Sequence, residues 1–412
     1  MARLAINGGP SVLKRRERQG EFRGPKHVSP LAKAFSDYCG AQFVIPFSSG
    51  TASLAAGLVA AGVGPGDEVI VPSYTWPASV NCILHVNGIP VFADVDAETF
   101  TIDVDDVASK ITDRTKAIIP VDYSGHPAAI PELMVLAESH GLLVLEDACQ
   151  AAGAAIDGVK LGNIAHMTAF SFSGKPITST QGGLFVTNSK DLYERAWVIG
   201  EHTSFLSQLE DAELRERYAP SLGYGYKFRL DPAAAEIAMT SLAELDRNNE
   251  ARIVNAEYLT KALSGVKGIK TPSVRPGCTH VYHMYTCLFD EAVVGVPRKR
   301  FIDAVEAEGV PVITYINSAN WLLFPGGREV TVGPIHLRPV FQEKNLYGKG
   351  CPFRCPHGVA PDYNEGTLPV SERLVHEEFN IDQESLSAPL DTQTMQLYAD
   401  AIIKVVENVD EL

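Results

Sequence analysis

The sequence has no long hydrophobic run and little positive charge. No stretch reaches the roughly 18 apolar residues that a membrane-spanning helix needs. The first residues, MARLAINGGPSVLKRRERQG, lack the apolar core and small-residue cleavage site of a secretory signal. We therefore expect no membrane partner and a cytoplasmic location. With 35 Lys and Arg against 50 Asp and Glu, the formal net charge is −15, which disfavours nucleic-acid partners.

Cysteine is scarce and scattered. The chain has seven cysteines, Cys39, Cys82, Cys149, Cys278, Cys287, Cys351 and Cys355. This odd, dispersed set predicts reduced thiols of a cytoplasmic protein rather than a disulfide framework. Cys351, Cys355 and His357 lie close together, but their spacing matches no standard zinc motif and the sequence nominates no fourth ligand. We expect a rigid loop with buried thiols there, and no metal.

The length of the chain predicts more than one core. At 412 residues, with 45% hydrophobic and 21% charged residues, the sequence is that of a globular protein too long for one ordinary core. This length predicts either two domains or one large α/β domain with an appendage. We place an N-terminal arm at residues 1–30, a large domain at 31–250 and a smaller α+β domain at 251–412.

An alternation of apolar runs and helix-like segments dominates the first half. The runs predict buried strands at Glu68–Pro72, Pro90–Val95, Lys116–Val121, Leu142–Asp147, Thr168–Ser173 and Gly183–Asn188. The segments between them predict helices at Ala52–Ala61, Pro77–His85, Val104–Ile111 and Ile130–His140. This order is typical of an α/β fold with a mostly parallel sheet, which binds ligands at the carboxyl ends of its strands.

The second half is less regular. Residues 201–232 are polar and predict a surface loop, and residues 317–365 show no clear period. Between and beyond them we expect a helix over Ala233–Leu263, a strand over His280–Phe289, a helix over Arg298–Gly309, a strand over Val310–Ile316 and a closing helix over Asp391–Val409.

A phosphate-sized anion site is one interpretation of FSSGTASL. This segment places Ser49, Gly50 and Thr51 at the start of an Ala-rich helix, where backbone N–H groups and hydroxyls attract anions. An ordinary N-cap explains the same residues.

Two further features follow predicted strands. In VLEDACQ, Asp147 ends a strand and Gln150 follows, so the carboxylate is placed to pair with a cationic ring nitrogen or to cap the next segment. In VPSYTWPAS, Trp76 is placed to stack on a planar cofactor or to fill a core.

Lys175 is the most informative residue. It stands alone in AFSFSGKPITSTQGG, among hydroxyl groups and glycines that suit a phosphate. A buried lysine has a lowered pKa and is a nucleophile for Schiff-base chemistry, although a surface lysine in a loop is the commoner case. Together, the phosphate cradle, aromatic residue, carboxylate and lysine are the four parts that a pyridoxal phosphate site needs.

The sequence resembles the DegT/DnrJ/EryC1/StrS aminotransferases, the sugar-aminotransferase branch of fold-type I pyridoxal phosphate enzymes. The motifs SSGTASL, GDEVIVPSYTWPAS, PVFADVD, TKAIIPV, EDACQAAGA, GKPITSTQGG and LGYGYKFRLDPAAAEIA follow the family's order. The resemblance implies that Lys175 forms the Schiff base with the cofactor and that Asp147 pairs with the pyridine nitrogen. It also places Gln150 near the ring hydroxyl and Trp76 on the ring face.

The resemblance implies a phosphate site as well. Gly50 and Thr51 bind the phosphate in the family, together with a serine before the lysine, which is Ser171 or Ser173 here, with Ser171 favoured. The family's Gly-Asp/Glu-Gly-Gly and Gly-Tyr-Asn-Tyr-Arg motifs are altered, with Gln181 in place of the carboxylate and Gly225 in place of the asparagine.

The resemblance implies an aminotransferase that moves an amino group from glutamate or glutamine to a nucleotide-linked keto sugar in amino-sugar or antibiotic biosynthesis. A keto cyclitol is the alternative acceptor. Dehydratases of the family carry a histidine in place of Lys175, and a non-catalytic binding protein has no need of Lys175, Asp147 and Gln150 together. Family members share active sites between two subunits, so we expect a homodimer in which Tyr224–Arg229 crosses to the partner.

Overall fold

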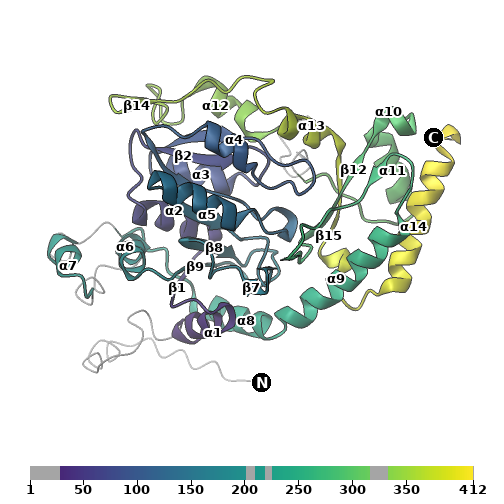
Figure 1. The fold of residues 1–412 in the computed structure, drawn as a ribbon. Helices are drawn as coiled ribbons and strands as arrows, with labels where there is room; N and C mark the ends of the chain where they lie inside the picture. The colour runs from purple at the N-terminus through teal and green to yellow at the C-terminus, as the bar shows by residue number, and fades with distance from the viewer. Residues whose placement is uncertain (1–27, 201–208, 219–224, 316–332, 412) are drawn as a thin grey trace.

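A seven-stranded sheet forms the centre of the larger part of the protein (Figure 1). The structure, a computed structural model, describes residues 28–200, 209–218, 225–315 and 333–411. The strand order is β1-β9-β8-β5-β4-β2-β3, and β9 runs against the other six. The strands are β1 (Phe43–Phe47), β2 (Glu68–Pro72), β3 (Ile89–Ala93), β4 (Thr115–Ile118), β5 (Leu143–Asp147), β8 (Met167–Ser171) and β9 (Gly183–Thr187). The predicted α/β fold with a mostly parallel sheet is confirmed.

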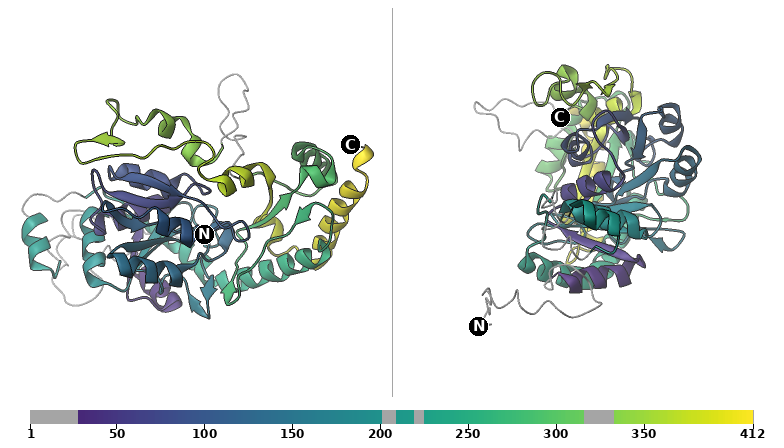
Figure 2. Two further views of the ribbon diagram at one scale, coloured as in Figure 1. Left: turned by 45° about the horizontal axis from the view of Figure 1, so that its top comes forward. Right: turned by 90° about the vertical axis from the view of Figure 1, so that its left-hand side faces the viewer.

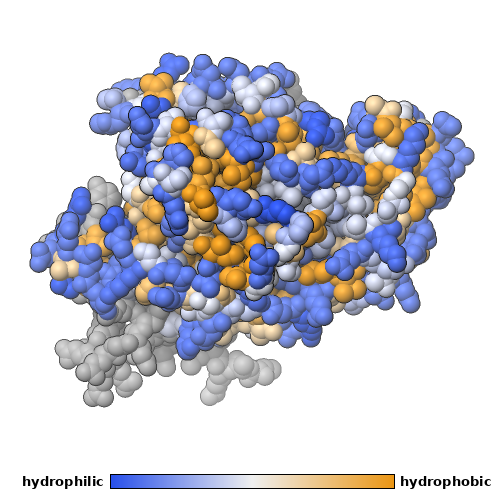
Figure 3. Space-filling model, viewed as in Figure 1, coloured by the Kyte–Doolittle hydropathy of each residue, from blue (hydrophilic) through white to orange (hydrophobic). Residues whose placement is uncertain are grey.

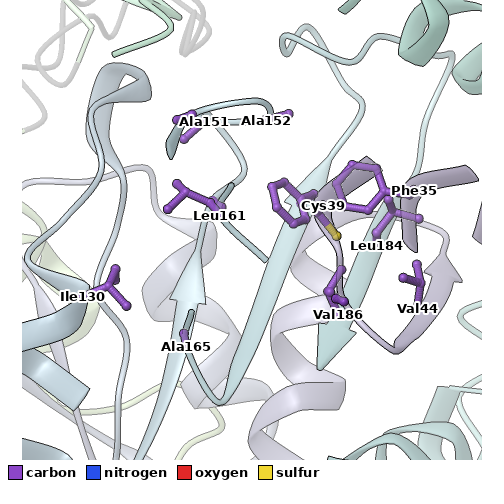
Figure 4. Packing of buried hydrophobic residues seen from close by; sticks show 14 of the residues in the cluster. Phe35, Cys39, Val44, Ile130, Ala151, Ala152, Leu161, Ala165, Leu184 and Val186 are labelled. Atoms are coloured by element: carbon purple, nitrogen blue, oxygen red, sulfur yellow. The ribbon is translucent and has the colours of Figure 1, made fainter. Parts of the chain in front are cut away.

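Helices cover both faces of this sheet. They are α1 (Ser29–Cys39), α2 (Gly50–Ala60), α3 (Ala78–His85), α4 (Val104–Ser109), α5 (Ile130–His140), α6 (Lys190–Gly200) and α8 (Pro232–Ala243). Helix α7 (Ala212–Tyr218) lies beyond α6, away from the sheet (Figure 1). Because strand side chains alternate between faces, Ile70 of β2 joins a core with α1, α5 and α8, while Val69 and Val71 join a core with α2, α3 and α6. Figure 4 shows the first core, where Phe35 of α1 lies near Leu184 of β9.

A smaller sheet and two long helices form the other end of the molecule (Figure 2). This sheet is antiparallel, in the order β10 (Ile269–Lys270), β12 (Met284–Phe289) and β15 (Glu378–Asp382). The surrounding helices are α9 (Leu245–Ala262), α10 (Glu291–Val294), α11 (Arg298–Ala307), α13 (Pro369–Glu377) and α14 (Thr392–Glu407). The predicted domain boundary at residue 250 falls inside α9, and the division of the chain stays a prediction.

Short strands and hairpins complete the fold. They are β6 (Ala155–Ile156), β7 (Val159–Lys160), β11 (Cys278–Thr279), β13 (Arg354–Cys355) and β14 (Gly358–Val359), with α12 (Pro339–Glu343) between them along the chain. In Figure 3 polar residues dominate the rim of this face, and apolar ones gather over the helices of the large sheet, where Val135 of α5 is exposed.

Three secondary-structure predictions are wrong. The helix predicted over Ala233–Leu263 is two helices, α8 and α9, which part at Glu244. Residues 310–315 form no strand, only an isolated bridge from Ile313, and Pro311 lacks the N–H that a paired strand donates. The predicted loop contains α7, whose start is capped by the Asp211 carboxylate accepting from the Leu214 N–H.

The irregular segment from residue 333 to 368 covers the edge strand β3. Phe341, Phe353 and Tyr363 pack around Phe92 of β3, and the rings of Phe341 and Tyr363 each lie 5.1 Å from that of Phe92. The Tyr363 hydroxyl donates to the Pro90 carbonyl at 2.7 Å. The segment thus shields an edge that would otherwise expose unpaired backbone.

A buried polar cluster joins the two sheets. Glu378 at the start of β15 is fully buried and accepts hydrogen bonds from the hydroxyls of Tyr74 and Tyr123, which lie in loops after β2 and β4. Asn380 donates to the same carboxylate at 3.2 Å. Because a buried carboxylate without partners is costly, these bonds fix the small sheet against the ends of the large one.

Stability is expected to fall between pH 7 and pH 5 because of a buried histidine between the loop after β4 and the segment before β11. His126 is buried, accepts from the Arg275 backbone N–H at 3.0 Å and donates to the Pro127 carbonyl at 2.8 Å, so its neutral form satisfies both ring nitrogens. Burial lowers the pKa of His126 from 6.5 to about 4. The unfolded chain therefore binds a proton first as the pH falls, and the folded state loses about 2 kcal/mol between pH 7 and pH 5.

Urea unfolding of the wild type and of His126→Gln at pH 7 and pH 5 measures this loss. The substituted protein should show a clearly smaller difference between the two pH values, whereas His140→Gln, at an exposed position on α5, should keep the wild-type difference. An unchanged difference in His126→Gln would contradict the assignment.

Candidate active site

The predicted site residues come together at the carboxyl ends of the parallel strands. Asp147 is the last residue of β5, Ser171 is the last residue of β8, and Lys175 lies in the loop after β8. Trp76 lies in the loop between β2 and α3. Parallel strands place such residues at one edge of the sheet, where α/β proteins bind their ligands.

The Lys175 side chain is half-buried and its amine contacts the second sheet's end of the molecule through one histidine. Its Nζ atom is 3.1 Å from Nε2 of His283, a buried residue directly before β12. Desolvation lowers the pKa of Lys175, and the nearby Cys149 and Asp147 side chains only partly offset this effect. A lysine with a lowered pKa is more often neutral and therefore more nucleophilic.

One side-chain donor and one backbone donor fix the Asp147 carboxylate. Its Oδ2 atom accepts from the Ser79 hydroxyl at 2.7 Å, and its Oδ1 atom accepts from the Cys149 backbone N–H at 3.2 Å. The Ser79 hydroxyl is also 3.1 Å from that of Thr75. The carboxylate thus has a defined orientation. The neighbouring carboxyl of Glu146 points to the opposite face of the sheet, where it accepts from Thr168 at 2.7 Å.

The start of α2 lies directly beside the end of β8. Ser49 is the N-cap of α2, and its side chain accepts from the Ala52 N–H at 3.0 Å. A Cβ atom at Gly50 would lie 2.8 Å from Cβ of Ser171. Ser171 therefore borders the helix N-terminus with Gly50 and Thr51, whereas Ser173 is exposed.

Gly50→Ala should disturb this corner. The new Cβ would lie 2.7 Å from Sγ of Cys149 as well as against Ser171, closer than atoms pack without a shift. We expect overpacking to cost about 1–3 kcal/mol, seen as a lower unfolding temperature. Gly64→Ala is the matched control, because a Cβ there meets no atom within 4 Å, and it should change the free energy of unfolding by less than about 0.5 kcal/mol. Equal effects of the two substitutions would refute the expectation.

Aromatic rings line the space near these residues. Trp76 is partly exposed and stacks on Tyr315, with ring centroids 5.7 Å apart and an interplanar angle of 27°. Tyr315 also meets the His283 ring edge to face at 6.5 Å. Gln150 is buried and accepts from the Ser124 backbone N–H at 2.8 Å. Its side-chain oxygen is thereby held by the loop after β4.

The family of the chain follows from comparison with known proteins. Residues 12–324 match the model of the DegT/DnrJ/EryC1/StrS aminotransferase family, which is more than half of the chain. The chain belongs to this family. It is a pyridoxal phosphate-dependent aminotransferase, as its motifs imply.

Similar proteins agree with this membership. The chain is 35% identical over 287 residues to GDP-perosamine synthase from Caulobacter vibrioides, covering 69% of this chain and 75% of the relative. It is 31% identical to the spore coat polysaccharide biosynthesis protein SpsC from Bacillus subtilis, covering 79% and 80%. The structure of DesV from S. venezuelae is 28% identical, with a TM-score of 0.75 over 94% of this chain and 91% of that one.

The residues present fit pyridoxal phosphate. The missing Cβ of Gly50 leaves the start of α2 open beside Ser171, which suits a phosphate at a helix N-terminus. The Asp147 carboxylate suits a protonated ring nitrogen, and the desolvated Lys175 amine suits a Schiff base with an aldehyde. Gly50 and Ser171 would hold the phosphate end of the cofactor, Asp147 its ring nitrogen and Lys175 its reactive carbon.

The sequence alone missed several neighbours of the site. Ser79 stands three residues after Trp76 in the motif TWPAS, a position on the first turn of α3 that turns its hydroxyl toward Asp147. Tyr315 lies in a segment that contains no motif pointing to a ligand site. His283, in HVYHMYTCLF, has no motif beside it that links it to Lys175.

One thiol of the cysteine-rich loop lies at the surface. Cys351 is exposed, so the prediction of buried thiols is wrong for it, because Phe353 instead fills the space against the sheet. Across residues 28–200, 209–218, 225–315 and 333–411, no cluster of three His, Cys, Asp or Glu side chains could hold a metal ion. Within the same ranges no helix is long and apolar enough to cross a membrane.

Proposed function

We propose that the protein transfers an amino group from glutamate or glutamine to a keto sugar that carries a nucleotide. The observation that carries this proposal is the desolvated Lys175 amine beside the oriented Asp147 carboxylate. The sugar is supported by the relatives, since one at 35% identity is a GDP-perosamine synthase and another a polysaccharide biosynthesis protein.

Each side chain has a distinct task in this proposal. When bound, pyridoxal phosphate supplies an aldehyde that condenses with amines and a ring that accepts electrons. The Asp147 carboxylate keeps a proton on the ring nitrogen, and Ser79 holds that carboxylate in place. The Lys175 amine, whose pKa is lowered by desolvation, would take the proton from Cα of the amino donor and pass it to the cofactor, and in the second half of the cycle it would carry a proton from the cofactor to the carbonyl carbon of the acceptor.

Binding and orientation fall to the other predicted residues. Ser49, Gly50 and Thr51, together with Ser171, form the phosphate end of the site. Trp76, which is partly exposed, offers its ring face to the cofactor. We keep Gln150 as the neighbour of the ring hydroxyl, since its amide N–H₂ group can donate there while its oxygen accepts from Ser124.

We also propose a homodimer with shared sites. The described part of the loop expected to cross, residues 225–229, passes the phosphate end, where the Phe228 carbonyl accepts from the Ser48 N–H at 2.6 Å. Tyr226 is 59% exposed there, and Ile237 of α8 is 45% exposed. Exposed apolar side chains next to a site are typical of a subunit interface.

Absorbance spectra of the purified protein test the proposal. Glutamate or glutamine should move the visible band of the bound cofactor to shorter wavelength, and a nucleotide-linked keto sugar should move it back. A panel with free keto sugars and keto cyclitols decides the acceptor. Restoration by a keto cyclitol alone would overturn the sugar assignment, and no change with either amino acid would overturn the donor.

A further inference from the structure

His283 has a defined protonation state. Its Nδ1 atom lies 3.2 Å from the side-chain oxygen of Gln383, which can only accept, so Nδ1 carries the proton. Nε2 therefore presents a lone pair, and the Lys175 amine 3.1 Å away must be the donor. Burial and the positive charges of Lys175 and Arg252 lower the pKa of His283 well below its ordinary value. The imidazole thus stays neutral.

The backbone holds this histidine firmly. Met284 of β12 pairs with Asp382 of β15, so His283 and Gln383 are the next cross-strand neighbours. The preceding residue, Tyr282, has a φ of 50°, a conformation that a bulky side chain adopts only when its surroundings enforce it. Its N–H donates to Nδ1 of His280 at 3.1 Å, and the two rings stack.

A second contact sets the position of this segment against the large sheet. The Val281 N–H donates to the Gly125 carbonyl at 3.1 Å. Gly125 has a φ of 95°, and a Cβ atom there would lie 3.0 Å from the backbone nitrogen of His283. The segment before β12 thus holds the imidazole against the lysine through contacts with the loop after β4.

We propose that His283 is a positioning residue for Lys175. The imidazole accepts one N–H of the free Lys175 amine and so aims the lone pair of the amine at the reacting carbon. The inference rests on the proposed role of Lys175. A neutral acceptor suits this task, because it orients the amine without adding a negative charge that would favour the ammonium form. Besides His283, the charged or titratable groups that act on the amine are Asp147 and Cys149, and Arg252 acts on the imidazole.

Substitutions that change only the acceptor test this role. His283→Glu places a carboxylate near the amine, His283→Gln keeps a neutral acceptor, and His283→Phe removes it. Competitive acylation of the full chain without cofactor, followed by peptide mass spectrometry, gives the pH midpoint of Lys175 reactivity. We expect His283→Glu to raise that midpoint by about one pH unit and His283→Gln to leave it within about 0.3.

Steady-state kinetics of the cofactor-loaded variants supply the second readout. His283→Phe should lower kcat about 10-fold and change KM for either substrate less than about threefold, because misplacement of the base affects the chemical step. His283→Gln should recover kcat to within about threefold. His126→Gln is the matched control, a buried histidine that does not contact Lys175, and it should keep the wild-type kcat.

The two proposals fail in different ways. Wild-type Lys175 that reacts like exposed Lys267 across the pH range would overturn its role as the active-site amine. A second outcome would overturn only the role of His283. In it, Lys175 of the wild type has a lowered midpoint, but the His283→Glu and His283→Phe proteins match the wild type in midpoint and kcat.

Discussion

Lys175→Ala protein should lose the visible absorption band of the bound cofactor and at least about 10³-fold in kcat. The substitution removes both the nucleophile that holds the cofactor and the base that moves the proton, and acid–base catalysis alone contributes about 10²- to 10⁴-fold. The chain has many other lysines, but this one has a desolvated amine next to His283 and near Asp147. Absorbance spectra and steady-state rates measure both losses.

Two variants control for this result. Lys175→Arg keeps a positive charge but forms no Schiff base, so it should be as inactive as Lys175→Ala. Lys267→Ala, at an exposed position, should keep the wild-type band and rate. Circular dichroism shows whether the variants fold. A folded Lys175→Ala protein that retains both the band and turnover would remove this lysine from the mechanism.

Asp147→Asn protein should lose about 10²-fold or more in kcat and yet remain folded. The amide has nearly the shape of the carboxylate but cannot stabilise a positive charge on the ring nitrogen, which is an electrostatic effect of the kind worth about 10²- to 10³-fold. The Ser79 hydroxyl holds one carboxylate oxygen at 2.7 Å, so Ser79→Ala should cost less, about 10-fold. Rates at saturating substrate measure both effects.

The neighbouring residue provides a matched control. Glu146 is as buried as Asp147, but its carboxyl lies on the other face of the sheet, and burial raises its pKa to about 7. Since a fraction of this carboxyl is already protonated and neutral at pH 7, Glu146→Gln should keep kcat within about threefold. A larger loss for Glu146→Gln than for Asp147→Asn would reverse the assignment of the two carboxylates.

Local patterns made the central sheet predictable. The strand at Glu68–Pro72 and the helix at Ile130–His140 have the predicted bounds, because buried strands are continuous apolar runs and the helix ends at Gly141. Strand β1 was missed, since Pro46 within a run of five residues weakens the strand pattern. The strand predicted at Val310–Ile316 is wrong although the segment is apolar. Its contact with β15 is a single bridge between Ile313 and Asn380, which an apolar pattern cannot reveal.

The candidate site was predictable in part for the same reason. Asp147, Ser171 and Lys175 follow strands whose shared edge can be inferred from their order. The partner of Lys175 could not be inferred, because His283 lies 108 residues further along the chain and reaches the amine through the packing of a second sheet. Ser79 and Tyr315 likewise gain their roles only from contacts made in the folded chain.

The most direct test of the account is the covalent attachment of the cofactor. Borohydride reduction of the cofactor-loaded protein converts a Schiff base to a stable secondary amine, and peptide mass spectrometry then locates it. We predict one modified peptide, which contains Lys175, and no modification in Lys175→Ala protein. Attachment to any other lysine, or none at all in a protein that binds the cofactor, would contradict the account.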